Sequence, residues 1–209
     1  MAVLEQAVAN PASLLAANRA ATGGTSAPVA AASSTGGGTS FAQALQSASA
    51  GAPTSALGAP SSGGTGGQIV RIAESQLGQA EQPPGSNESP AIALYRTATA
   101  GAIPGAPWCA YFASWAARQA GEPLGVGGEG LGSVGQIWSW AQSTGRAIPG
   151  GPGVTPQPGD LIMFGDEHVG IVREVLPNGD IATIEGNYEN KVAANLRTPS
   201  EATGYVNMN

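Results

Sequence analysis

The stretch that decides the fold is DLIMFGDEHVGIVREVLPNGDIATIEGN, residues 160–187. Its short apolar runs alternate with turn residues, which is the pattern of strands rather than helices. We predict one buried strand from Asp160 to Phe164, a second at 168–176 and a third at 181–187. The intervening PNGD at 177–180 is a strong turn signal, so the second and third strands are expected to form a hairpin.

Upstream of these strands the apolar residues recur at helical steps of three and four. Ser89 before Pro90 and Ser133 are expected to cap helices, and Gly78 to end one. The expected helices are QIVRIAESQLG (68–78), SPAIALYRTATAG (89–101), CAYFASWAARQAG (109–121) and SVGQIWSWAQSTG (133–145), and TGYVNMN (203–209) is expected to add a last strand. Helices followed by strands predict an α+β domain, with the helices packed on a small antiparallel sheet.

Residues 1–66 have a different character, because Gly, Ser, Ala and Thr dominate them. Such segments cannot bury enough apolar surface to offset the entropy of ordering, so we predict a disordered tail before a domain at 67–209. Two islands, Val3–Ala16 and FAQALQSA at 41–48, keep helical spacing. They are either transient helices or docking segments for a partner or an export machine.

Composition excludes several classes of protein. The net charge of −6 argues against nucleic-acid binding, which needs a basic face, and gives no attraction to anionic membranes or wall polymers. No apolar run approaches the roughly 18 residues of a membrane span. The start of the chain lacks the basic and apolar regions of a Sec signal peptide. With one cysteine and one histidine, neither an intramolecular disulfide nor a structural zinc site is expected.

Cys109 is the candidate nucleophile. Pro107-Trp108-Cys109 places it where a loop enters a predicted helix. The unpaired N–H groups and partial positive charge of a helix start stabilise a thiolate and make it reactive. The alternative is a buried structural cysteine that packs as a small hydrophobic residue.

His168 is the only residue that could serve as an imidazole base for this thiol, because the chain has one histidine. It opens an apolar strand, which would hold the ring rigidly toward a cleft, and imidazole titrates near neutrality. The alternative is a surface histidine at a turn.

Glu185 and Asn187 end the next predicted strand, on the other arm of the hairpin from His168. A carboxylate or amide there could accept a hydrogen bond from the second ring nitrogen. We expect Glu185 at a cleft reached by solvent. The alternative is a pair of solvated residues where the strand leaves the sheet.

Together, PWCAYFASWAARQAG, QPGDLIMFGDEHVGIV and IEGNY resemble the CHAP family of cysteine, histidine-dependent amidohydrolases and peptidases, over residues 68–209. The family's W-C motif matches Cys109, its histidine after P-G-D matches His168, and its E-x-N pattern matches Glu185, with Asn187 as a further polar member. The related NlpC/P60 enzymes often use a second histidine, which this chain lacks.

The resemblance implies a papain-like core that hydrolyses amide bonds of peptidoglycan peptides through a thioester on Cys109. Backbone N–H groups at the helix start would hold the oxyanion. No cofactor is implied. Some members carry an acidic calcium loop before the cysteine, but RTATAGAIPGAP at 96–107 contains no Asp or Glu, so we predict no metal site. Trp108 and Trp138 are candidates for a substrate groove, although helical tryptophans more often belong to the core.

Three functions remain open from the sequence. The first is a peptidoglycan endopeptidase or amidase. The second is a CHAP-like structural protein of a flagellar or phage assembly, with weak or no catalysis. The third is an intracellular thiol amidase. FAQALQSA (41–48) looks like segments of exported flagellar rod and hook proteins, although a phage tail or lysis protein would have the same composition. We expect a secreted or wall-associated protein, cytoplasmic before export, which the tail brings to a flagellar-type export partner.

Overall fold

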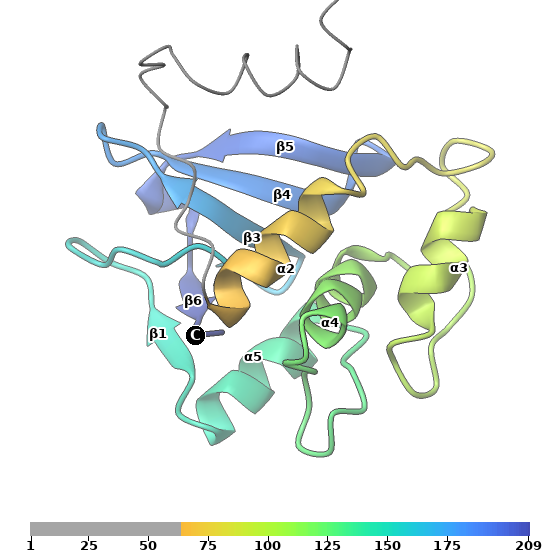
Figure 1. Ribbon diagram of the computed structural model, residues 1–209, viewed down its shortest axis with the longest axis horizontal. Coiled ribbons are helices and arrows are strands. Elements are labelled where there is room, and N and C mark those ends of the chain that lie inside the picture. The colour runs from red at the N-terminus through yellow and green to blue at the C-terminus, as the bar shows by residue number, and fades with distance from the viewer. Residues whose placement is uncertain (1–63) are drawn as a thin grey trace, which may run out of the picture. The chain divides into compact units, whose positions relative to one another are not determined.

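The computed structural model describes residues 64–209 (Figure 1). Residues 1–63 of the predicted disordered tail, with both of its helical islands, lie outside the described residues. The described part begins with a helix at Thr65, slightly before the domain boundary expected at 67. None of the described helices is long and apolar enough to span a membrane.

The described residues form four α-helices, a short 3₁₀ helix and six strands. The helices are α2 (Thr65–Glu74), α3 (Pro90–Arg96), α4 (Cys109–Gln119), α5 (Val134–Ser143) and the 3₁₀ helix η2 (Pro199–Glu201). The strands are β1 (Ala147–Pro149), β2 (Leu161–Phe164), β3 (His168–Val175), β4 (Ile181–Tyr188), β5 (Lys191–Arg197) and β6 (Gly204–Val206).

The strands form one antiparallel sheet in the order β1-β6-β2-β3-β4-β5, which confirms the predicted α+β class. The β3–β4 hairpin at the PNGD turn is confirmed, as are the caps at Ser89 and Ser133. β1 and β5 were not predicted. α2 ends at Glu74 rather than at Gly78, which leaves Leu77 outside the helix and 45% exposed.

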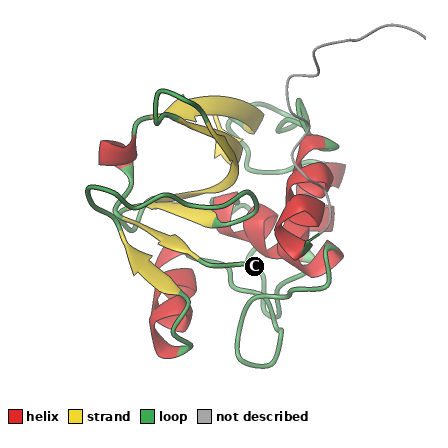
Figure 2. Ribbon diagram, turned by 60° about the vertical axis from the view of Figure 1, so that its left-hand side comes forward, coloured by secondary structure: helices red, strands yellow, loops and turns green. Residues whose placement is uncertain are grey.

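The four α-helices gather against one face of the sheet (Figure 2), where α4 packs on β3 and β4. α4 is the central helix, and every residue from Cys109 to Ala117 is buried. Gly186 of β4 permits the close approach, since a Cβ there would lie 2.6 Å from the Cβ of Phe112. The start of α4 is therefore fixed against the end of β4.

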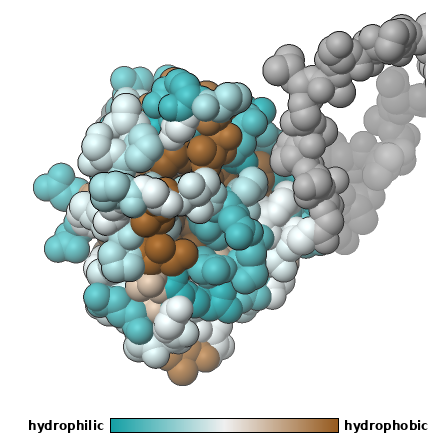
Figure 3. Space-filling view, turned by 90° about the vertical axis from the view of Figure 1, so that its left-hand side faces the viewer, coloured by the Kyte–Doolittle hydropathy of each residue, from teal (hydrophilic) through white to brown (hydrophobic). Residues whose placement is uncertain are grey.

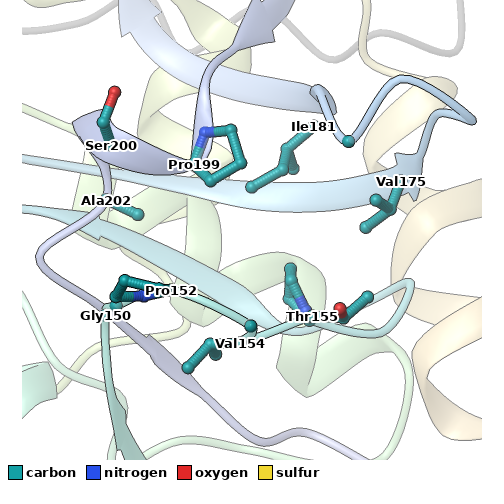
Figure 4. Close-up of a pocket in the computed structure, with 13 residues that line it drawn as sticks. Gly150, Pro152, Val154, Thr155, Val175, Ile181, Pro199, Ser200 and Ala202 are labelled. Atoms are coloured by element: carbon teal, nitrogen blue, oxygen red, sulfur yellow. The ribbon is translucent and has the colours of Figure 1, made fainter.

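The opposite face of the sheet carries a second, smaller cluster of buried side chains, formed by Ile162, Val172, Ile181 and Tyr205. A bulge between Val172 and Glu174 shifts the strand register, so Val175 packs with this cluster. Beside it lies a cavity of about 520 Å³ between the loop at 150–156 and η2 (Figure 4). Figure 3, which views the left side of Figure 1, shows apolar patches on this side that are separated by polar residues. No titratable side chain lines the cavity, so the reactive groups lie elsewhere.

The beginning of α2 meets the last residue of the chain. Gly66 lies so close to the Pro158 carbonyl oxygen and the Asn209 side chain that no Cβ could be accommodated there. Pro158 belongs to the segment that leads into β2, so both contacts lie beside the start of this strand. The two ends of the described chain therefore lie together at the end of the strands where β2 starts.

Candidate active site

Cys109 is the first residue of α4, as the sequence predicts. Trp108 is the residue before the helix and supplies no side-chain cap, so the first-turn N–H groups of α4 keep their capacity to bind an anion. The thiol is free of any disulfide and is 5% exposed. This burial alone would fit the alternative of a structural cysteine, and the neighbours of the thiol decide between the two.

His168 opens β3 and lies beside Cys109. Its ring Nε2 is 2.9 Å from Glu185 Oε2, and because an ionised carboxylate only accepts, the ring nitrogen donates. Nδ1 is then the nitrogen left for the thiol. The ring also stacks on Phe164, its partner across the β2–β3 pair, with centroids 5.7 Å apart. His168 is thus held between a thiol and a carboxylate.

The electrostatics of this pair favour a charged imidazole. Burial alone would lower the pKa of His168, but its hydrogen bonds to Cys109 and Glu185 and the negative charges of both groups raise this pKa to about 9. The raised pKa favours the protonated ring at neutral pH. A protonated imidazole beside a thiol is the arrangement that a thiolate–imidazolium pair requires, and we expect such a pair here.

Glu185 is close to His168 across the hairpin, as predicted, but its surroundings differ from the prediction. The side chain is fully buried, so the expectation of a solvent-reached cleft is wrong. Gly170 on β3 makes room for it, since a Cβ at that position would lie 2.8 Å from Glu185 Cγ. Burial would raise the pKa of Glu185, but hydrogen bonds from Arg197, His168 and Thr183 lower it to about 2.

Two of these partners were missed in the sequence analysis. Arg197 donates from Nε to Glu185 Oε1 at 2.8 Å and from an Nη to Oε2 at 2.6 Å. Thr183 donates its hydroxyl to Oε1 at 2.6 Å. Thr183 had a signal in the sequence, because it precedes Glu185 by two residues and so shares its face of the strand. Arg197 had none, because β5 was not recognised as a strand.

Asn187 lies on the side of the site where Cys109 stands. It has a left-handed backbone with φ of 61°, which asparagine tolerates better than most residues. Its Oδ1 accepts from the backbone N–H of Trp108 at 2.9 Å, and its Nδ2 donates to Glu81 at 3.2 Å. Asn187 therefore fixes the loop that leads into Cys109. It is brought into the site, but through Trp108 rather than through the imidazole.

Trp108 and Trp138, the two candidates for a substrate groove, lie in different environments. Trp108 has no exposed surface, packs among Tyr95 and Phe112, and donates its indole N–H to the buried Glu81 at 3.0 Å. The prediction that it lines a substrate groove is therefore wrong. Trp138 is half-buried and borders a hollow of about 200 Å³, together with Met163, Gly165, Asp166 and Thr203.

No three His, Cys, Asp or Glu side chains between residues 64 and 209 gather closely enough to hold a metal ion. The charged and nucleophilic side chains at this site contact one another in sequence. Cys109 faces His168, His168 faces Glu185, and Glu185 faces Arg197.

The reactivity of Cys109 tests the thiolate–imidazolium pair directly. Native protein is expected to react with iodoacetamide at pH 6 on the order of 10-fold faster than a free cysteine, of which well under about 1% is thiolate at that pH. His168→Ala should slow the reaction and move its rise toward higher pH. The rate constant is measured by mass spectrometry across pH 4–10. Truncating the ring opens space beside the thiol rather than closing it, so a slower reaction in His168→Ala would report the loss of the imidazole. Identical profiles for native and urea-denatured protein would contradict the ion pair.

Residues 101–187 match the family model of the CHAP domain. This match confirms the resemblance drawn from the motifs, and its residues include Cys109, His168, Glu185 and Asn187. CHAP domains are generally hydrolases, and the match indicates amidase- or peptidase-like chemistry on peptidoglycan. No similar protein was found among curated proteins, and none among solved structures.

Proposed function

We propose that this protein is a cysteine-dependent hydrolase that cleaves peptide or amide bonds of bacterial peptidoglycan through a thioester. The observation that carries the proposal is the line of contacts from Cys109 through His168 to Glu185. A thiol, an imidazole and a buried carboxylate in that order are the parts of a nucleophile, base and orienting-acid system.

The chemistry follows from the charges. The Cys109 thiolate attacks the carbonyl carbon, and first-turn N–H groups of α4 stabilise the oxyanion. The C–N bond breaks as the His168 imidazolium gives its proton to the leaving nitrogen, which leaves a thioester. The neutral imidazole then takes a proton from water, whose oxygen attacks the thioester. The product acid departs and the thiolate–imidazolium pair is restored.

The pKa of His168 sets the upper limit of the pH range over which the protein is expected to be active. Because that pKa is raised to about 9, the proton needed by the leaving nitrogen stays available through neutral pH and is lost as pH passes about 9. The ordinary pKa of histidine, about 6.5, would place this loss below neutrality.

Trp138 remains a candidate contact for the substrate. The hollow that it borders includes Gly165 and Asp166, which belong to the turn directly before His168. An aromatic wall beside a carboxylate suits a peptide that carries both apolar and cationic groups. Trp138→Ala would then raise KM more than it lowers kcat.

The alternative is a non-catalytic structural protein. It gives no reason for an ionised carboxylate buried behind the only histidine, an arrangement that catalysis explains. We further propose that the enzyme acts outside the cytoplasm, and that residues 1–66 bring it to its wall substrate or to a flagellar-type export partner.

The deciding experiment is digestion of purified peptidoglycan by wild type and by Cys109→Ala. New amino and carboxyl termini are identified by mass spectrometry. Termini released by wild type alone would support the proposal and identify the bond. Folded, alkylation-competent wild type that releases none from any peptidoglycan type would favour the structural alternative.

A further inference from the structure

Arg197 makes the most extensive contact with the acid of this site. Its guanidinium meets Glu185 with two hydrogen bonds, of 2.8 and 2.6 Å, in the forked geometry that only arginine provides. The Glu185 side chain has no exposed surface, and that of Arg197 is 18% exposed. The pair is therefore largely shielded from water, where the loss of one partner has a large effect.

The guanidinium is itself held in place. It lies 4.8 Å from the ring centroid of Phe164 and 5.1 Å from that of Tyr188, and it contacts Glu201 at 3.3 Å. Phe164 also stacks on the ring of His168. One aromatic ring thus touches both the base and the cation that anchors the acid.

We propose that Arg197 is a positioning residue for this site, and that Arg197 holds Glu185 ionised and oriented toward His168. The inference deepens the proposed function and rests on it, because it assigns a role within the same catalytic arrangement. Arg197 lies beyond residues 101–187, so the match to the family model does not include it.

The groups that face Glu185 indicate where the effect of Arg197 will appear. His168 approaches from β3, Arg197 from β5 and the Thr183 hydroxyl from β4 itself. Further out, Cys109 of α4 faces His168, and Glu201 of η2 faces Arg197. Without Arg197, a buried carboxylate keeps only His168 and Thr183 as donors, so it takes up a proton at a higher pH. Protonated Glu185 no longer supports the imidazolium charge, so the reactivity of Cys109 is expected to fall with it.

The effect is expected in acid rather than at neutral pH. Arg197 also repels the imidazolium, so its removal does not by itself weaken the thiolate–imidazolium pair while Glu185 stays ionised. The rate of Cys109 alkylation near pH 7 should therefore change less than about 10-fold. Its acid limb should move to higher pH, by at most the roughly 1–3 units by which the loss of an adjacent opposite charge raises the pKa of a carboxyl group such as Glu185.

The test compares alkylation of Cys109 by iodoacetamide from pH 3.5 to 8 in wild type, Arg197→Met and Arg197→Lys. Lysine keeps the charge but not the fork, so its acid limb should lie between the other two. Arg173→Met is the matched control, because Arg173 also donates Nε to a glutamate, Glu74, but at an exposed site away from Cys109. The control should reproduce the wild-type profile.

A double variant separates positioning from general stability. In a Glu185→Gln background, Arg197→Met should cause no further shift of the acid limb, because there is no carboxylate left to protect. Circular dichroism identifies variants that are folded over the pH range. If Arg197→Met is not folded, the Lys variant carries the test.

Two outcomes would overturn the proposal: a folded Arg197→Met or Arg197→Lys protein with the wild-type acid limb, or an equal shift with and without Glu185. Neither depends on hydrolysis of peptidoglycan. Failure of wild type to digest peptidoglycan would contradict the proposed function while leaving this readout valid.

Discussion

Cys109→Ala and His168→Ala are each expected to lower peptidoglycan hydrolysis by about 10⁶-fold, and the double variant by no more than either alone. The thiol and the imidazole act as one unit. The proton that the thiol gives up to become a reactive thiolate is the same proton that the imidazolium later donates to the leaving nitrogen. When either group is absent, the other cannot carry out its part of the reaction. The rate is measured as new amino termini released per enzyme from purified peptidoglycan.

Two observations would contradict this expectation. Multiplicative losses in the double variant would mean that the two residues contribute separately, as structural residues do. Substantial activity in Cys109→Ala would mean that another group is the nucleophile. Cys109→Ser supplies a matched control of similar size, and it should also be nearly inactive because a hydroxyl is far less acidic than a thiol.

Glu185→Gln is expected to reduce activity by something on the order of 10²- to 10⁴-fold, as when the orienting acid of a serine triad is disabled. Glutamine keeps the shape and one acceptor, but its amide NH₂ must face a donor, either the imidazole N–H or the guanidinium of Arg197. The imidazolium also loses its nearest negative charge apart from the thiolate.

Because Glu185 is fully buried, Glu185→Gln is also expected to lower the stability of the folded protein. A partly exposed arginine left without its carboxylate should lower the free energy of unfolding by up to about 3 kcal/mol, the lower end for a broken buried ion pair. Activity is therefore compared at a temperature at which both proteins are folded, as judged by circular dichroism.

Asn187→Ala is the comparison that separates the two polar residues of the E-x-N pattern. It removes the acceptor for the Trp108 N–H, so it should disturb the loop before Cys109 and reduce activity less than Glu185→Gln does. If Asn187→Ala destroyed activity while Glu185→Gln stayed near wild type, Asn187 would be the orienting residue and the assignment of Glu185 would be wrong.

The line from Cys109 to Glu185 could be predicted because each residue has a local signal. A proline-containing loop before an apolar helical period places Cys109 at a helix start. A strong turn sequence between two apolar strands places His168 and Glu185 on adjacent strands near the same end. These signals lie within a few residues of the groups that they position.

The surroundings of that line could not be predicted, because they depend on pairing between segments without a local signal. β5 contains two alanines and an asparagine, which are depleted in strands, so neither the strand nor Arg197 was expected. Without β5 beside it, Glu185 is expected at a strand end that solvent reaches. Trp108 appeared exposed for a similar reason, because the buried Glu81 that accepts its indole N–H comes from a distant loop.

The meeting of Gly66 with Pro158 and Asn209 has a consequence for how the enzyme can be tethered. That contact lies where β2 begins, whereas His168 pairs with Phe164 at the other end of β2. A partner joined to the domain at residue 64 or at residue 209 is therefore attached at the end of the strands away from His168. A bulky polymer could approach the His168 end while the domain is anchored through either of these residues.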